Sequence, residues 1–257
     1  ESVLMQKVDV PWEIIIGDDE STDGTREICI EYAKKYPDLI RLFLHKRENN
    51  RKVLGKPCGI FQIIYNTYEL RGEYIAHISG DDKWGTSNKL TSQYSFLSNN
   101  DEYSLVKVRS KRMNEKGEFF VKEKYGFGYP SNGMTKNVFF KMPDEMVHSI
   151  NEDTFMLAII KQFGKTYLLN NDEYTIRRVL SSNLWANNKE VDKQAHFLNT
   201  AELMYEVFGK VDHAIKRQFA SRLSKSNKTK YKYFVKDYFI FVYYFYYKIR
   251  YNFFKLK

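Results

Sequence analysis

Two pairs of adjacent carboxylates stand where short apolar runs end. Asp18 and Asp19 follow the β-branched run Trp12–Gly17, and Asp81 and Asp82 come shortly after the run EYIAHI. Aspartate oxygens are hard ligands that suit Mg²⁺ or Mn²⁺. Two neighbouring aspartates in a loop can hold such a cation against a diphosphate, where the cation stabilises the charge of a leaving group. The pairs therefore indicate a metal-dependent site for a diphosphate ligand.

A third acidic pair opens a predicted helix further along the chain. Glu152 and Asp153 begin the segment Glu152–Phe163, and a carboxylate placed across such a site could deprotonate a hydroxyl group. The alternative is structural, because acidic residues in a first helical turn interact favourably with the helix dipole. Asp81-Asp82 could likewise form a turn or a cap. For Asp23 we predict helix capping rather than chemistry.

Strands and helices must position these side chains, and they alternate in the first half of the chain. An alternating order predicts an α/β fold with an open, mostly parallel sheet flanked by helices. In such sheets ligands bind beyond the carboxyl ends of the strands, which is where both aspartate pairs fall. The predicted strands are Trp12–Gly17, Leu39–Leu44, Glu73–Ile78 and Tyr103–Arg109, and the predicted helices are Thr22–Tyr36, Gly59–Leu70 and Thr86–Leu97.

The second half is less regular. We expect an irregular crossover in the Gly- and Pro-containing segment Lys124–His148, and a hairpin turn at Lys116-Gly117. Strands are predicted at Thr166–Leu169 and Glu173–Arg178. A C-terminal helical appendage follows, with helices at Val191–Phe208 and Asp212–Leu223 and a basic linker at Ser224–Lys230.

The C-terminal tail, 229–257, is basic and aromatic. The chain has a formal charge of +9, and Lys and Arg crowd the region from Lys216 onward. The apolar run Tyr238–Tyr247 is too short to cross a bilayer and suits an interfacial helix against anionic lipid headgroups. Docking on the body or on a partner chain is the alternative. Single-stranded nucleic acid is a third partner class, but no nucleic-acid motif accompanies the tail, so we expect no nucleic acid.

Cysteine usage and the N-terminus bear on the compartment. Cys29 and Cys58 have no metal-ligand spacing, and two free thiols fit a reducing compartment. The N-terminal residues lack the charged and apolar regions of a signal peptide. We expect a cytoplasmic protein that is peripheral on the inner face of the cell membrane.

Four segments, in this order, together resemble the family 2 glycosyltransferases of the GT-A fold. GDDKW with Lys89-Leu90 and Gln93 resembles a subgroup linked to bacterial surface polysaccharide. The segments are Trp12–Thr25 (WEIIIGDDESTDGT), Glu73–Lys89 (EYIAHISGDDKWGTSNK), Asn151–Leu157 (NEDTFML) and Arg177–Trp185 (RRVLSSNLW). The resemblance implies a GT-A domain at 1–188, a helical extension at 189–228 and the tail at 229–257.

The resemblance also implies roles for the aspartates. Asp19 would hydrogen-bond the nucleotide base, consistent with uracil, and Asp18 would support its loop. Asp81 and Asp82 would bind the ribose and a Mn²⁺ or Mg²⁺ ion on the diphosphate. Asp153 would be the general base. These side chains must then converge on one cleft although they lie far apart in the sequence.

Three further residues are candidates for binding. Arg178, with its neighbour Arg177, could bind phosphates bidentately, and surface pairing is the alternative. Trp84 could stack on a sugar or a base, or pack in the core. Glu152 would lie beside the base on the acceptor side.

The implied function is that of an inverting glycosyltransferase. It would transfer a sugar from a nucleotide-diphosphate sugar, UDP-linked, to a glycan or lipid-linked acceptor in surface-polysaccharide synthesis. A displacement assisted by a base on the opposite face inverts the anomeric carbon. The alternatives are a truncated, non-catalytic scaffold of the same fold and, at low weight, a basic nucleic-acid-binding protein.

The chain departs from the family pattern in three places. The family opens with a strand whose loop lines the nucleotide pocket, whereas Glu1 corresponds to the helix after it, so we expect the sheet to lack a central strand. Ser79 stands where the fuller metal motif has an additional Asp. Leu180 stands where the closing segment often supplies a His, so a cation would rely on Asp82, phosphates and water.

Overall fold

The computed structural model describes most of the first 181 residues and a few helical positions beyond them. The described residues are 1–50, 52–53, 56–57, 60–120, 131–139, 142–143, 146, 148–149, 151–181, 196, 199–200, 203–204 and 206–208. The chain divides into two compact units, Glu1–Asn187 and Asn188–Lys257. Cys58, the predicted helix Asp212–Leu223, the linker and the tail 229–257 lie outside the described residues.

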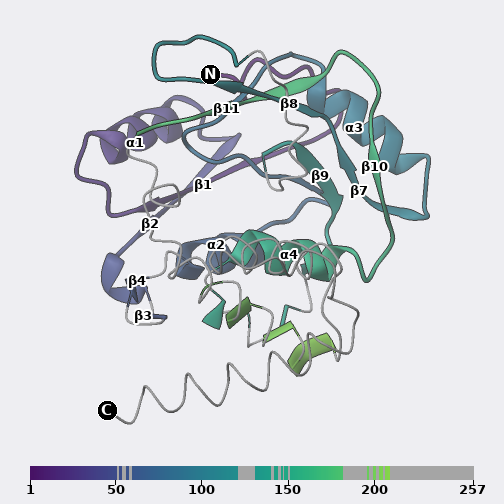
Figure 1. The fold of residues 1–257 in the computed structure, drawn as a ribbon. Helices are drawn as coiled ribbons and strands as arrows, with labels where there is room; N and C mark the ends of the chain where they lie inside the picture. The colour runs from purple at the N-terminus through teal and green to yellow at the C-terminus, as the bar shows by residue number, and fades with distance from the viewer. Residues whose placement is uncertain are drawn as a thin grey trace, which may run out of the picture. The chain divides into compact units, whose positions relative to one another are not determined.

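The first strand pair carries the first aspartates. β1 (Ile14–Asp19) and β2 (Ile40–His45) are parallel and in register from Ile14 opposite Ile40. The helices α1 (Thr25–Lys35) and α2 (Ile60–Tyr68) lie on opposite sides of this pair (Figure 1). Asp18 and Asp19 therefore end a strand that is packed from two sides.

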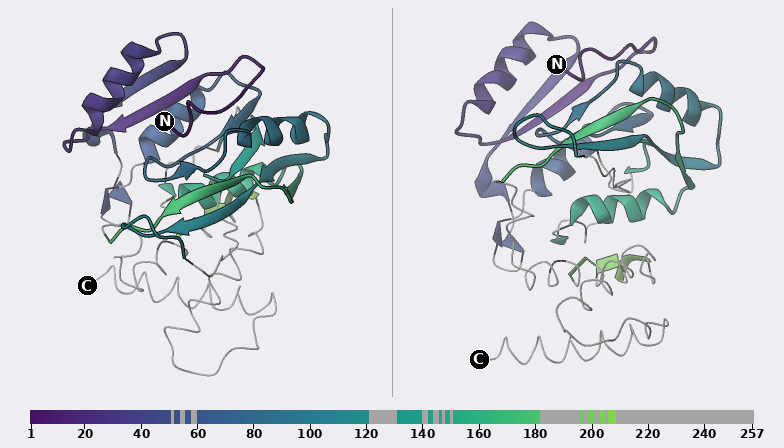
Figure 2. Two further views of the ribbon diagram at one scale, coloured as in Figure 1. Left: turned by 90° about the horizontal axis from the view of Figure 1, so that it is seen from above. Right: turned by 45° about the horizontal axis from the view of Figure 1, so that its top comes forward.

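A four-stranded sheet forms the centre of the first unit. Its order is β10-β7-β9-β5, with β7 and β10 parallel and β9 antiparallel to both β5 and β7. Helix α3 (Lys89–Ser98) packs on β7 and β9, and α2 and α4 (Glu152–Ile160) both lie below the strands in Figure 1 and in the right view of Figure 2. The strands are β5 (Tyr74–Ala76), β7 (Tyr103–Lys107), β9 (Gly133–Lys136) and β10 (Lys165–Leu168).

A three-stranded sheet brings the closing segment beside the second aspartate pair. Its order is β6-β11-β8, with β11 (Tyr174–Arg178) antiparallel to β6 (Lys83–Trp84) and parallel to β8 (Arg109–Met113). Because β6 starts directly after Asp82, the pairing places the end of β11 against that carboxylate. The loop after β2 holds η1 (Arg47–Asn49), β3 (Lys52–Val53) and β4 (Lys56–Pro57).

The α/β class is confirmed, and the main departure is a strand in the predicted crossover. β9 lies within Lys124–His148, where the sequence GMTK shows neither alternation nor strand-forming residues at its ends. It is stabilised by pairing on both edges and by the burial of Met134 and Thr135. The sheet is therefore mixed at its centre rather than parallel throughout. The hairpin turn is confirmed, with Gly117 at φ 84.

One cluster of apolar side chains supports the elements around the acidic loop. Trp84, Leu90, Leu97, Val106 and Met134 are buried together, so that α3, β6, β7 and β9 share a core. No helix in the described part of the chain is long and apolar enough to cross a membrane.

Candidate active site

A cavity of about 1280 Å³ gathers most of the predicted site residues. Strand ends, the loop after β5, the start of α4 and the end of β11 all contribute to its walls. The predicted residues that line it are Asp81, Asp82, Trp84, Glu152, Asp153 and Arg178. Asp18 and Asp19 are not among its lining residues, although Gly17 of the same strand is. Of the four residues expected to converge on one cleft, Asp81, Asp82 and Asp153 line this cavity, and Asp19 does not.

The cavity extends between two open strand edges. In the described part of the chain β1 pairs only with β2, and β5 pairs only with β9. Ile15 and Gly17 line the cavity from β1, and Ile75 and Ala76 line it from β5.

The loop that carries Asp81 and Asp82 is held by β11. The backbone N–H of Arg178 donates to Asp82 Oδ1 at 3.3 Å, and Arg178 Nε donates to the carbonyl of Asp81 at 2.5 Å. Within the loop, the N–H of Asp82 donates to the carbonyl of Ser79 at 3.0 Å. The side chain of Arg178 therefore orders the acidic loop, whereas the sequence analysis proposed that it binds phosphate.

The Asp82 carboxyl lies in an environment that resists its ionisation. Burial raises the pKa of Asp82 above its ordinary value, and the neighbouring Asp81 acts in the same direction. A hydrogen bond from Ser131, the charge of Arg177 and the Arg178 backbone N–H oppose this rise. A cation at Asp82 would act in the same direction as Arg177.

The start of α4 presents two more carboxyl groups with raised pKa values. Burial, and then the charge of Asp153, raise the pKa of Glu152 to about 7. Burial also raises the pKa of Asp153, against hydrogen bonds from Thr154 and the charge of Arg177. Thr154 donates its N–H at 2.6 Å and its hydroxyl at 3.1 Å, and both bonds engage Oδ1 of Asp153 rather than Oδ2.

Arg177 links the two walls of the cavity. Its positive charge lowers the pKa of Asp82 and also that of Asp153. Arg177, Asp82 and Asp153 all line the same cavity, which is the common space that the sequence analysis expects for positions 82 and 153.

The donor set at this place fits a hard divalent cation that is shared with a ligand. Among the described residues, no group of three or more His, Cys, Asp and Glu side chains is arranged to hold a metal ion. Mg²⁺ in proteins is commonly bound through one or two carboxylates, with phosphate oxygens and water completing the shell. Asp81 and Asp82 supply such carboxylates, and Leu180 lines the cavity without adding a ligand.

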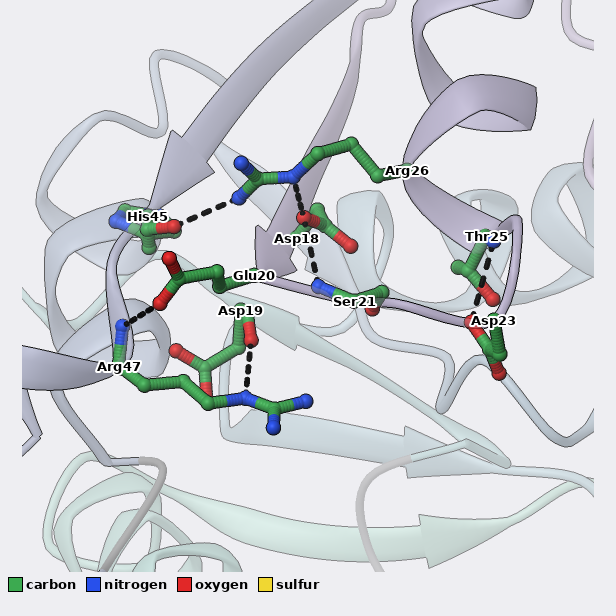
Figure 3. A network of polar contacts seen from close by, with 9 residues as sticks. All are labelled: Asp18, Asp19, Glu20, Ser21, Asp23, Thr25, Arg26, His45 and Arg47. Atoms are coloured by element: carbon green, nitrogen blue, oxygen red, sulfur yellow. Dashed lines mark hydrogen bonds and ion pairs between the residues drawn. The ribbon is translucent and has the colours of Figure 1, made fainter.

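The loop after β1 forms a separate polar network (Figure 3). Asp18 is 3% exposed and accepts hydrogen bonds from Arg26 Nε at 2.5 Å and from the N–H of Ser21 at 3.3 Å. Arg26 also donates to the carbonyl of His45, which ties α1 to the end of β2. Burial would raise the pKa of Asp18, but the bonds from Ser21 and Arg26 outweigh it, and the pKa is lowered.

Asp19 points to the loop that follows β2. Asn50 donates to both of its carboxylate oxygens, at 3.0 Å and 2.8 Å, and Arg47 donates to its backbone carbonyl at 3.0 Å. The nearby Asp23 side chain accepts from the N–H of Thr25, the first residue of α1, at 3.2 Å. The N-cap residue is Gly24, without a side-chain cap, so the prediction that Asp23 caps this helix is wrong.

The sequence analysis missed two residues that organise this region. Arg26 holds Asp18, and Ser131 contacts the loop of Asp82. An arginine eight positions after an aspartate, and a serine within the predicted crossover, belong to no motif that could have revealed them. Trp84 is only 4% exposed, which favours the packing role over stacking on a sugar.

A comparison with known families identifies the chain. The sequence model described as "Glycosyl transferase family 2" matches residues 1–149, which is more than half of the 257 residues. The chain belongs to glycosyl transferase family 2. The resemblance drawn from the sequence is thereby confirmed.

Two curated proteins of Bacillus subtilis are similar to part of the chain. The putative glycosyltransferase EpsE is 34% identical over 106 residues, which cover 41% of this chain and 34% of EpsE. The putative teichuronic acid biosynthesis glycosyltransferase TuaG is 34% identical over 86 residues, which cover 34% of this chain and 30% of TuaG. The matched segments span about a quarter to a third of the length of the curated relatives.

A solved structure shares the GT-A fold of the family. The crystal structure of S. aureus TarS 1-349 in complex with UDP aligns with a TM-score of 0.54 and 17% identity, over 89% of this chain and 67% of that chain. This likeness concerns the fold.

The Asp18–Arg26 ion pair gives a test of the first acidic loop. We expect Arg26→Gln to destabilise the protein by about 1–3 kcal/mol at pH 7, because a charge-assisted bond to a buried carboxylate is lost. Since the folded-state pKa of Asp18 is lowered, this contribution is present above the unfolded pKa of about 4 and is lost as the pH falls through the folded value.

Urea unfolding at several pH values measures this loss. Lys46→Gln is the matched control, because Lys46 pairs with Glu48 at the surface, with 70% and 72% of the side chains exposed. Equal effects of the two substitutions at pH 7 would contradict the assignment.

Proposed function

We propose that the chain transfers a sugar from a nucleotide-diphosphate sugar, UDP-linked, to a glycan or lipid-linked acceptor with inversion of the anomeric carbon. The observation that carries the proposal is the single cavity that Asp82 and Asp153 line from different walls, with Arg177 acting on both. A reaction with a departing diphosphate on one side and an activated hydroxyl on the other needs this arrangement. Membership of family 2 supports it.

On the donor side, Asp82 and Asp81 would hold Mn²⁺ or Mg²⁺ with the diphosphate, and Arg178 would keep their loop in place. The bound cation would stabilise the negative charge of the departing diphosphate. Arg177 adds a fixed positive charge close to the same place. The UDP bound to TarS, a protein of the same fold, supports a uridine nucleotide.

The base-recognition role proposed for Asp19 requires a change at its side chain. Asn50 engages both carboxylate oxygens of Asp19, so a uracil would either replace Asn50 or bind Asp19 together with it. Asp18 keeps a supporting role, since its carboxylate accepts hydrogen bonds from Arg26 and Ser21.

On the acceptor side, Asp153 would take the proton of the attacking hydroxyl. Burial raises its pKa toward the range in which a carboxylate accepts a proton effectively at neutral pH. Glu152, with a pKa of about 7, lies beside it and would share or stabilise that proton. A base across the sugar from the diphosphate leads to inversion by a single displacement.

The acceptor and the location are inferred from relatives and from the tail. TuaG is named for teichuronic acid biosynthesis, which supports a surface-polysaccharide acceptor. The basic aromatic segment 229–257 would hold the protein on the inner face of the membrane.

We expect deletion of residues 229–257 to abolish co-sedimentation of the protein with phosphatidylglycerol vesicles. Unchanged co-sedimentation would contradict this role of the segment.

A non-catalytic scaffold is the second candidate. Leu180 supplies no metal ligand, and β1 and β5 have open edges in the described part of the chain. Sugar transfer by the purified protein would exclude this candidate.

Asp82→Ala tests the metal-nucleotide site. We expect wild-type protein to bind UDP with Mn²⁺ in isothermal titration calorimetry, and Asp82→Ala to weaken binding at least tenfold, because a metal ligand is lost. Asp38→Ala removes an exposed carboxylate outside the cavity and should bind like the wild type. Equal binding by all three proteins would remove the metal claim.

Asp153→Asn tests the base. We expect kcat to fall by about 10²- to 10⁴-fold while Mn²⁺-UDP binding persists, because the proton acceptor is lost after binding. In the wild type the rate should fall as the pH falls through the raised pKa of the base, since only the ionised carboxylate accepts a proton. Asp172→Asn, at an exposed site, is the control.

The stereochemistry of the product separates this mechanism from its alternative. Proton NMR of the new glycosidic linkage should show the anomeric configuration opposite to that of the donor. A retained configuration, or full activity of Asp153→Asn, would rule out Asp153 as an inverting base.

A further inference from the structure

We propose that Trp84, Lys89, Gln93 and Ser131, here called the Trp84 cluster, are positioning residues that fix the Asp82 carboxylate for the metal-bound nucleotide. The inference rests on the proposed function and deepens it by assigning the support of its donor side. These residues belong to α3, to β6 and to the turn before β9, and none of them was assigned this role from the sequence.

Ser131 connects the cluster to the acidic loop. Its hydroxyl accepts the backbone N–H of Ser79 at 3.2 Å and donates to the Ser79 hydroxyl at 3.4 Å. A hydroxyl group can accept one bond while it donates another. Ser131 therefore holds the start of the four-residue loop that presents Asp82.

Trp84 fixes the backbone of Ser131. Its indole Nε1 donates to the Ser131 carbonyl at 3.1 Å, while the ring is 4% exposed. Because Trp84 follows Asp82 by two positions, the same residue anchors the exit of the acidic loop in the core. The loop is thus tied to the turn before β9 through both the side chain and the carbonyl of Ser131.

Lys89 lies on the face of the Trp84 ring. Its Nζ is 4.4 Å from the ring centroid and donates to Gln93 Oε1 at 2.6 Å, and the residue is fully buried. In the part of the chain that the structure describes, no carboxylate forms an ion pair with it, and Glu173 acts on it only through space. An apolar side chain would be cheaper to bury. The contacts of the amine with the Trp84 ring and with Gln93 account for a lysine at this place.

Gln93 completes the cluster by joining two strands. Its amide group donates to the carbonyl of Val106 at 3.0 Å and to the carbonyl of Asn132 at 3.1 Å. Val106 belongs to β7, and Asn132 is the residue after Ser131. Gln93 therefore connects Lys89, which contacts the Trp84 ring, to Asn132, which follows Ser131.

The acidic loop is consequently held from two independent directions. Arg178 binds it from β11, and Ser131 binds it from the turn before β9. A carboxylate that is ordered before binding costs less conformational entropy when a ligand arrives. Removing the hydroxyl of Ser131 should weaken binding of the metal-bound nucleotide, although no ligand to the metal is lost.

The decisive experiment measures Mn²⁺-UDP binding to serine variants. We expect Ser131→Ala to bind about three- to tenfold more weakly than the wild type, the range of one lost hydrogen bond, and Ser131→Thr to restore binding because the hydroxyl remains. Ser98→Ala, which removes an exposed hydroxyl at the end of α3, should have no effect. Restoration by threonine is a result that a general loss of stability would not give.

A double-mutant cycle tests the path through Trp84. Trp84→Phe keeps a ring but loses the Nε1 donor, and its effect should not add to that of Ser131→Ala, since both act through one residue. Lys89→Met should reproduce the effect of Trp84→Phe. If these core variants fail to fold, the variants of the half-buried Ser131 still decide between the two outcomes.

The outcomes separate the two levels of the proposal. If the wild type does not bind Mn²⁺-UDP, the proposed function fails and the cluster has nothing to position. If the wild type binds and Ser131→Ala binds equally tightly, the proposed function stands and the positioning role is wrong.

Discussion

The electrostatic interaction of Arg177 with the carboxylates of Asp82 and Asp153 is the one on which the proposed chemistry depends. Burial raises the pKa of both carboxyl groups, and the charge of Arg177 counteracts that rise at each of them. Without this positive charge, the two buried carboxylates would favour their protonated forms still more. A protonated Asp82 is a poor metal ligand, and a protonated Asp153 cannot act as a base. One arginine therefore favours the ionised form that each of the two proposed roles requires.

Topology explains how residues so distant in sequence meet. The loop of Asp82 leaves β5 and enters β6, and β6 pairs with β11, which ends in Arg177 and Arg178. The acidic loop thus joins the four-stranded sheet to the three-stranded sheet. Arg178 and Ser131 hold it from these two sheets, and α4 supplies the opposing wall. The proposed sugar transfer would therefore take place at the junction between two sheets rather than at the end of one sheet.

Local sequence was sufficient to predict the acidic pairs, because a β-branched run followed by aspartates marks a strand end wherever it occurs. It was insufficient for β9, whose four residues become a strand only through their two neighbours in the sheet. The roles of Ser131 and Arg26 could not be predicted for a similar reason, because the fold brings their partners, Ser79 and Asp18, to them. The contact of Asn50 with both carboxylate oxygens of Asp19 likewise depends on the path of the loop after β2.

The central claim is that Asp82 binds a nucleotide-associated cation inside the cavity that Asp153 and Arg177 share. Anomalous diffraction at the manganese edge, from crystals grown with Mn²⁺ and UDP, tests it most directly. The account predicts one anomalous peak about 2 Å from an Asp82 oxygen, within reach of the diphosphate and on the Arg177 side of the cavity. A manganese peak bound to other residues, with UDP present and Asp82 unoccupied, would contradict it.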